Sequence, residues 1–157
     1  MKLWSLPLLV CLAACSRSPE EAQQKLAEIQ VPQTPESLIA KTKDAKDEEV
    51  ARMLVQAGVD PNARQENGMT VLMSAAFNGQ HDVVRALLEK GAQVNADAKG
   101  FNALSLAVER NDKAMVQLLL ANGAQARTRP GGGLSALEKA QQARNAELSA
   151  LLEKAAQ

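Results

Sequence analysis

The single histidine of the chain, His81, is followed directly by an acid, Asp82, and this pair is the first candidate for chemistry. A histidine oriented by a carboxylate acts as a general base for a serine or cysteine nucleophile. Adjacent residues on a helix, however, point about 100° apart, so Asp82 is poorly placed to orient the His81 ring. The sequence also lacks a Gly-x-Ser-x-Gly motif, and one histidine cannot assemble a zinc site alone. We therefore expect no catalytic residue, no metal and no other cofactor.

A run of three glycines, Gly131–Gly133, raises the question of a phosphate-binding loop, because glycines expose backbone N–H groups. The lysine and the serine or threonine that hold phosphate and magnesium in such loops do not follow it. We expect a flexible hairpin tip at this place.

The charges of the chain balance, with 18 Lys and Arg residues against 18 Asp and Glu residues in a total of 157. The chain has no excess of positive charge that would attract nucleic acid or an anionic membrane surface. The length suits one domain. The partner is therefore not expected to be nucleic acid.

The N-terminus has the order of an export signal, with Lys2 ahead of the apolar stretch Leu3–Ala14, which is too short to span a bilayer. The stretch ends in Leu-Ala-Ala before Cys15, which resembles the lipobox of bacterial lipoproteins. The resemblance implies cleavage after residue 14, a lipid on Cys15 and attachment to the periplasmic side of the cell envelope. Ser16, where inner-membrane lipoproteins often carry Asp, implies the outer membrane. The alternative is an ordinary cleaved export signal, because small residues also suit that cleavage.

Cysteine usage agrees with an oxidising compartment. Cys11 lies inside the signal and Cys15 would be consumed by the lipid, so the mature chain would hold neither a free thiol nor a disulfide. Two or more acyl chains on one residue give firm anchoring. The membrane is thus expected to be contacted through the N-terminal lipid only.

Residues 15–34 are expected to be a polar tether that contains a short capping helix. The stretch EEAQQKLAEIQ places Ala22, Leu26 and Ile29 on one helical face, with acids at its start.

The remainder of the chain repeats. The segments that begin at Gly68, Gly100 and Gly133 align with periods of 32 and 33 residues, and a further copy lies upstream. One polar residue per copy precedes an apolar helical run and is expected to be its N-cap. These residues are Ser37, Thr70, Asn102 and Ser135.

A second helix follows in each copy, after a polar break that contains Lys46, Gly79 or Asn111. It is expected to bury two residues four positions apart, which is the spacing of an amphipathic helix. The pairs are Val50 and Leu54, Val83 and Leu87, Met115 and Leu119, and Leu148 and Leu152. Gly58, Gly91 and Gly123 are expected to end these helices in the left-handed conformation.

The segment GQHDVVRALLEKGAQVNA, residues 79–96, resembles the ankyrin repeat in period and in its helix-turn-helix-loop order. The resemblance implies an all-α solenoid over residues 35–157, with repeats at about 35–66, 67–98, 99–131 and 132–157. The repeats are divergent, because the tetrapeptide Thr-Pro-Leu-His of that family appears as Thr-Val-Leu-Met, Asn-Ala-Leu-Ser and Ser-Ala-Leu-Glu. His81 and Asp82 fall at the start of a second helix, where we expect solvated side chains.

The terminal copies differ from the central ones as caps would. Ser149 and Glu153 stand at apolar positions of the last copy, whose outer face has no further neighbour. Thr42 and Lys43 replace a pair of alanines in the first copy. We expect both ends to be capping repeats.

The resemblance assigns partner contacts to the concave face, which is made of loop tips and the outward side of each first helix. Residue by residue, this face would hold Arg64, Glu66, Asn67, Met69, Phe77, Asn78, Asp97, Lys99, Phe101, Glu109 and Arg110. Phe77 and Phe101 are the only phenylalanines of the chain, and exposed aromatic rings often anchor interfaces. The alternative is that each ring folds back onto its own helix pair or loop.

These observations predict a monomeric, lipid-anchored periplasmic protein that binds another protein. The resemblance leaves two narrower roles open: an immunity protein that neutralises an antibacterial toxin, or a helper of an exported antioxidant enzyme such as catalase. An envelope hydrolase is the third alternative, and the absence of a nucleophile motif argues against it.

Overall fold

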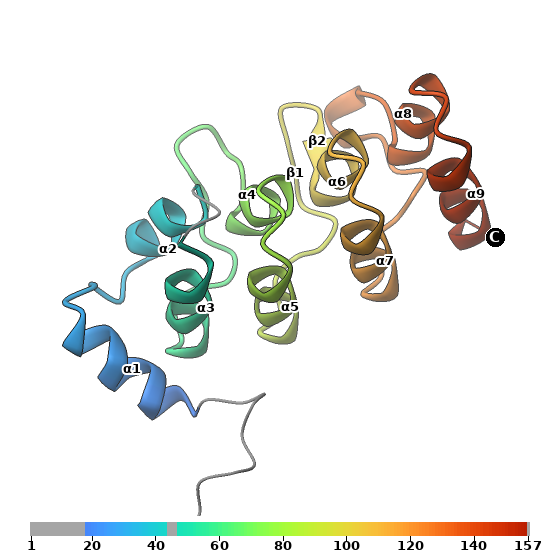
Figure 1. The fold of residues 1–157 in the computed structure, drawn as a ribbon. Helices are drawn as coiled ribbons and strands as arrows, with labels where there is room; N and C mark the ends of the chain where they lie inside the picture. Colours follow the sequence, from blue (N-terminus) through green and yellow to red (C-terminus); the bar gives the residue numbers. More distant parts are fainter. Residues whose placement is uncertain (1–17, 44–46, 157) are drawn as a thin grey trace, which may run out of the picture.

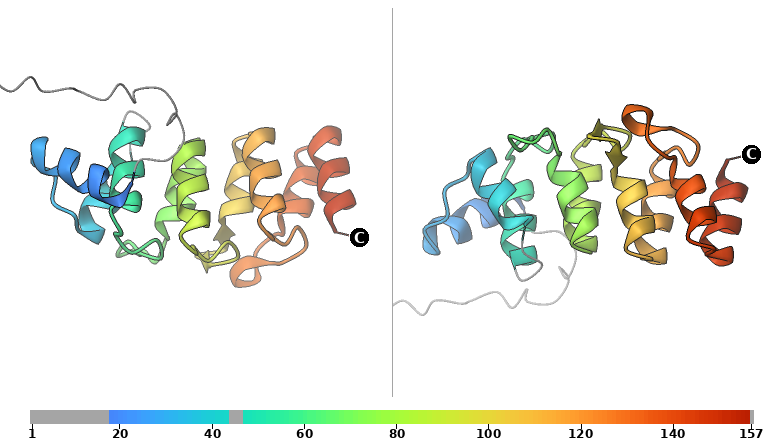
Figure 2. Two further views of the ribbon diagram at one scale, coloured as in Figure 1. Left: turned by 90° about the horizontal axis from the view of Figure 1, so that it is seen from below. Right: turned by 90° about the horizontal axis from the view of Figure 1, so that it is seen from above.

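The computed structural model describes residues 18–43 and 47–156, which form an elongated stack of antiparallel helix pairs (Figures 1 and 2). The expectations for Cys15, Ser16 and Lys46 lie outside the described residues. The elements are α1 (Pro19–Glu28), α2 (Pro35–Lys41), α3 (Glu48–Gln56), α4 (Val71–Phe77), α5 (His81–Glu89), β1 (Asp97–Ala98), β2 (Phe101–Asn102), α6 (Ala103–Glu109), α7 (Lys113–Ala121), the 3₁₀ turn η2 (Pro130–Gly132), α8 (Ala136–Gln142) and α9 (Ala146–Ala155). No helix of this part of the chain is both long and apolar enough to cross a bilayer.

The helices lie in two rows (Figure 1). The first row holds α2, α4, α6 and α8, and the second holds α3, α5, α7 and α9. The two helices of each pair pack on each other, and α2, α3, α4 and α6 also pack on a helix of the next pair. The buried residues form one apolar core cluster along the stack. The all-α solenoid expected from the sequence is confirmed.

The first-row helices begin where the polar residues of the repeat indicated, with one exception. Thr70, Asn102 and Ser135 cap α4, α6 and α8, with side-chain oxygens 3.2, 2.8 and 3.2 Å from the backbone nitrogens they accept from. The prediction for Ser37 is wrong, because Thr34 caps α2 and accepts from the Ser37 backbone nitrogen at 3.3 Å. Pro35 starts that helix early, since its fixed φ suits the first helical position and it has no N–H to satisfy.

The predicted stripe of the second-row helices forms the core between neighbouring pairs. Seven of its eight residues are fully buried, and Val50 of the first pair is half-buried. A fully buried side chain of this size contributes about 1.5–3 kcal/mol relative to an exposed one, so this stripe is a main source of stability.

Gly91 ends α5 in the left-handed conformation, with φ of 86°. The Gly91 N–H donates to the Leu88 carbonyl at 3.0 Å, and the Ala92 N–H donates to the Leu87 carbonyl at 2.9 Å. These bonds form a Schellman motif that satisfies the last carbonyls of the helix. Gly58 and Gly123 also have positive φ after α3 and α7, so the predicted stops are confirmed.

Polar side chains of the loops link neighbouring repeats. Asn62 accepts from the Gln93 backbone nitrogen at 2.9 Å, and Asn95, one repeat later, accepts from the Gln125 backbone nitrogen at 2.9 Å. Asn95 also donates to the Gly123 carbonyl at 3.0 Å. These bonds fix the spacing of consecutive repeats on the loop side.

Helix α1 covers the N-terminal end of the second row (Figure 1). Ala22 and Leu26 are fully buried, and Gln23 donates to the Ala57 carbonyl at 3.2 Å. The prediction for Ile29 is wrong, because α1 ends at Glu28 and the Ile29 side chain is 46% exposed. At the other end Glu153 is exposed and Ser149 half-buried, as suits the outer face of a terminal pair.

Three loops, here called fingers, project ahead of α4, α6 and α8. The first finger is residues 64–70, the second is residues 97–102 and the third is residues 127–134. A bridge between Arg64 and Thr70 closes the first finger, and strands β1 and β2 form the antiparallel ladder of the second.

The fingers stack closely on one another. A Cβ added to Gly68 would lie 3.8 Å from the Ala98 Cβ, and one added to Gly133 would lie 3.0 Å from the Gly100 carbonyl oxygen. The glycine run was expected to be a flexible hairpin tip. Instead it packs against the second finger, and the lack of side chains permits this close approach.

Candidate partner-binding face

His81 does not pair with Asp82. Its Nε2 lies 3.0 Å from Asp112 Oδ2, in the next repeat, and Asp112 also caps α7 by accepting from the Met115 backbone nitrogen at 3.0 Å. The backbone nitrogen of Asp82 donates to Glu48 Oε1 at 3.1 Å. The expectation of a merely solvated His81 therefore needs correction, because the half-buried ring links two repeats. This geometry orients the His81 ring toward Asp112 of the next repeat.

Phe77 ends α4 on the opposite row, and its side chain is 42% exposed. The guanidinium carbon of Arg110 lies 5.4 Å from the centre of the ring. Arg110 caps the C-terminus of α6 in the next pair, so this cation–π contact joins two repeats.

Phe101 begins β2 in the second finger and is 36% exposed. The ammonium group of Lys139, on α8, lies 4.1 Å from the centre of the ring. The same ammonium forms an ion pair with Glu109 at the end of α6, and the Lys139 side chain is only 12% exposed. Neither ring folds back onto its own helix pair alone, because each contacts a cation from the following repeat.

Lys139 is a residue of this face that the sequence reasoning missed. It stands at the repeat position of Ser74 and Leu106, both of which are buried. The sequence did offer one signal for Lys139, because a lysine stands there at a repeat position that is buried in the two preceding copies. Its contact with Phe101 requires one particular conformation of a long side chain, and the repeat pattern does not encode it.

The other predicted face residues divide into two groups. Arg64, Glu66, Asn67, Asp97, Lys99, Glu109 and Arg110 are exposed, and Met69 and Asn78 are half-buried. Met69 packs against the core, and Asn78 donates to the Thr42 carbonyl at 2.7 Å. These two residues therefore have structural contacts whether or not a partner is bound.

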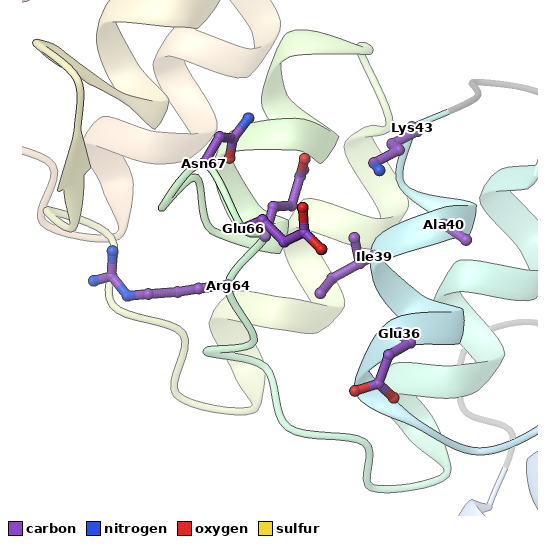
Figure 3. A pocket seen from close by; sticks show the side chains of 8 residues that line it. Glu36, Ile39, Ala40, Lys43, Arg64, Glu66 and Asn67 are labelled. Carbon is purple, nitrogen blue, oxygen red and sulfur yellow. The ribbon is translucent and has the colours of Figure 1, made fainter.

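A groove of about 600 Å³ opens between α2 and the first finger (Figure 3). Its lining residues are Glu36, Ile39, Ala40, Lys43, Arg64, Gln65, Glu66 and Asn67. The predicted face included Arg64, Glu66 and Asn67 of this set and omitted Gln65, the α2 residues and Lys43. They were missed because the first copy was interpreted as a cap only.

Glu138, on α8, is the acidic residue that binds the third finger to that helix. It receives two hydrogen bonds from the Arg129 guanidinium, one of them 3.0 Å long, and it completes a capping box with Ser135. The hydrogen bonds from Arg129, followed by those from Ser135, lower the pKa of Glu138 from 4.5 to about 2. The Glu138 carboxylate is therefore the ionised partner that holds the third finger in place.

Comparison with known proteins identifies the repeats. The sequence profile of ankyrin repeats, in three copies, matches residues 38–130. The chain belongs to the ankyrin-repeat family. Ankyrin-repeat domains generally mediate contacts between proteins and are typically non-enzymatic.

Relatives with similar ankyrin repeats come from varied organisms. The chain is 43% identical over 84 residues to the B-cell lymphoma 3 protein homolog of Mus musculus, covering 52% of this chain and 19% of the relative. It is 39% identical over 88 residues to palmitoyltransferase Hip14 of Drosophila melanogaster, covering 55% and 14%. It is 38% identical over 71 residues to an ankyrin repeat-containing protein of Treponema pallidum, covering 45% and 24%. The matches thus span less than a quarter of these relatives, and the similarity is one of repeats.

Proposed function

We propose that this ankyrin-repeat chain is a lipid-anchored protein of the periplasm that binds a partner protein through its concave face. The observation that carries the proposal is the pair of exposed rings, Phe77 and Phe101, on consecutive repeats of that face. Aromatic side chains and arginine are enriched in the centres of protein interfaces, where they supply much of the binding energy.

The cations beside the rings favour binding in a second way. A cation–π contact at an exposed site contributes about 0.5–1 kcal/mol, which restrains the ring before the partner arrives. A restrained side chain loses less conformational entropy on binding, and immobilising a free one costs about 0.5–1.5 kcal/mol. Phe101, held by Lys139 at 4.1 Å, is the better restrained of the two rings.

The surroundings of the rings suit a protein partner. Arg110 and Glu109 lie next to each other at the end of α6, so a hydrophobic centre is bordered by charges of both signs. This arrangement resembles an interface with an apolar centre and a polar rim. A single partner that contacts both rings would bridge the second and third repeats.

The lipid anchor and the location rest on the sequence. The Leu-Ala-Ala-Cys end of the apolar segment supports lipidation of Cys15, and Ser16 supports sorting to the outer membrane. A polar segment then joins Cys15 to the capping helix α1. In this proposal the lipid contacts the membrane and the ankyrin repeats contact a partner in the periplasm.

Site-specific photo-crosslinking in intact cells tests the binding role. A photoreactive amino acid that replaces Asn67, exposed on the first finger, should yield a discrete crosslinked product that mass spectrometry identifies. The matched position is Gln117, exposed on α7 in the second row, where no discrete product is expected. Equal crosslinking from both positions, or from neither, would contradict binding through the concave face.

A further inference from the structure

The row of fingers has an open end. The second finger covers the first at Gly68 and Ala98, and the third covers the second at Gly100 and Gly131. In the described residues no finger precedes the first one, because α1 leads to α2 through the short segment 29–34. The outer side of the first finger therefore faces the groove instead of a neighbouring finger (Figure 3).

The first finger carries a side chain that does not suit another stacked finger. Glu66 stands at the repeat position of Ala98 and Gly131, the small residues that receive the preceding finger in the later repeats. A Cβ on Gly131 would already lie 3.1 Å from the Gly100 nitrogen, so there is no room for a glutamate in such a stack. Glu66 instead lines the groove.

The groove combines an apolar floor with three charged side chains that form no ion pair within residues 18–43 and 47–156. Ile39 is half-buried and lies between the α2 side and the finger side of the groove in Figure 3. Glu36, Lys43 and Glu66 line it, and none of the three forms an ion pair with another described residue. The Arg64 guanidinium leads away from Ile39 and donates to the Gly68 carbonyl at 3.0 Å. Two acids and two bases thus line the groove, and one of the bases, Arg64, is bound to the backbone of its own finger.

A lysine or arginine side chain complements these groups. Its aliphatic stem would cover Ile39, and its charged head would lie beside Glu36 and Glu66. Lys43 would repel a second cation, so the groove suits one basic residue rather than a polybasic tract. A volume of about 600 Å³ also accommodates the turn that carries this residue.

We propose that this groove binds a loop of the partner protein that presents a single lysine or arginine. The loop takes the place that a preceding finger would occupy in a longer stack. This inference rests on the proposed function, and it extends the binding face from the second and third repeats to the first.

A defined probe tests the groove without the natural partner. The probe is a disulfide-closed hairpin peptide with one arginine in its turn, and the control peptide carries citrulline, which keeps the shape and loses the charge. Titrated at millimolar concentrations into the ¹⁵N-labelled full-length protein in detergent, the arginine peptide should shift the amide resonances of Ile39, Lys43 and Glu66 saturably. The citrulline peptide should leave them in place.

Variants give the second readout. Glu36→Gln together with Glu66→Gln should abolish the shifts, and Glu89→Gln, exposed at the end of α5, should retain them. Equal shifts with citrulline, stronger shifts with a glutamate peptide, or shifts on another face would overturn the inference. The same resonances moving with protein concentration alone would mean that a second copy occupies the groove, which also overturns it. Asn67 lines the groove, so crosslinking there does not separate the two proposals. The peptide titration reports on the groove alone, and the affinity of a Phe77→Ala, Phe101→Ala variant for the partner reports on the face of the second and third repeats, so the two proposals fail separately.

Discussion

Arg110 lies over the ring of Phe77, with its guanidinium carbon 5.4 Å from the ring centre, although the two residues belong to consecutive helix pairs. Lys139 lies over the ring of Phe101 in the same way. Each of the two exposed aromatic rings therefore contacts a cation of the following repeat. The same side chains thus stabilise the stack and form the centre of the proposed binding face.

The contact between Phe77 and Arg110 should be measurable in a double-mutant cycle. Phe77→Ala, Arg110→Ala and the double variant are compared by urea unfolding followed by far-UV circular dichroism. We expect a coupling energy of about 0.5–1 kcal/mol, the usual size of an exposed cation–π contact. Strict additivity of the two single substitutions would show that the contact contributes nothing to stability.

Gly91 provides a test of the repeat geometry. Its φ of 86° is unfavourable for a β-branched residue, so Gly91→Val should destabilise the domain by about 1–2 kcal/mol. Gly91→Asn is the matched control and should cost less, because asparagine tolerates this conformation. A Cβ at this position would have no heavy atom within 4 Å, so steric overlap does not confuse the comparison. Equal urea midpoints for both variants and the wild type would contradict the assignment.

The attachment of the third finger should depend on pH. The pKa of Glu138 falls to about 2 in the folded state from an ordinary value of 4.5, so its contribution to stability is complete above pH 4.5. That contribution is lost as the pH falls from 4.5 through 2, because the carboxylate takes up a proton and loses Arg129. The stability difference between wild type and Glu138→Gln should therefore narrow over this interval. In an Arg129→Ala background, this stability difference should change less with pH. A stability difference between wild type and Glu138→Gln that stays constant with pH would refute the ion pair of Glu138 with Arg129.

Lipidation should depend on one residue. Metabolic labelling with a fatty-acid analogue should mark the wild-type protein and miss Cys15→Ala, because the Cys15 thiol is the proposed attachment point. The labelled protein should fractionate with the outer membrane. An unlabelled wild-type protein that is soluble in the periplasm would make the ordinary export signal the correct interpretation.

The sequence predicted those parts of the fold that depend on local signals. Thr70, Asn102 and Ser135 were recognisable as caps because each precedes an apolar run, and Gly91 was recognisable because it follows one. Ser37 misled the same reasoning, because Thr34 and Pro35 form a competing start three residues earlier.

Contacts between repeats could not be predicted in the same way. The partner of His81 is Asp112, which stands 31 residues later and therefore at a different repeat position. The contact of Lys139 with Phe101 likewise joins different repeat positions. The periodic pattern fixes which backbone segments are neighbours, whereas these pairs depend on side-chain conformations that vary from one copy to the next.

The central claim is that the concave face binds the partner, and Phe77→Ala combined with Phe101→Ala tests it most directly. The measurement is the affinity of the purified variants for the partner identified by crosslinking at Asn67, after circular dichroism has shown that each variant is folded. The double variant should bind more weakly by about 2 kcal/mol, which is roughly a 30-fold loss of affinity. His81→Ala, whose contact with Asp112 lies in the other helix row, should bind as the wild type does. Unchanged binding of the phenylalanine variant, with binding lost in folded His81→Ala, would contradict the account.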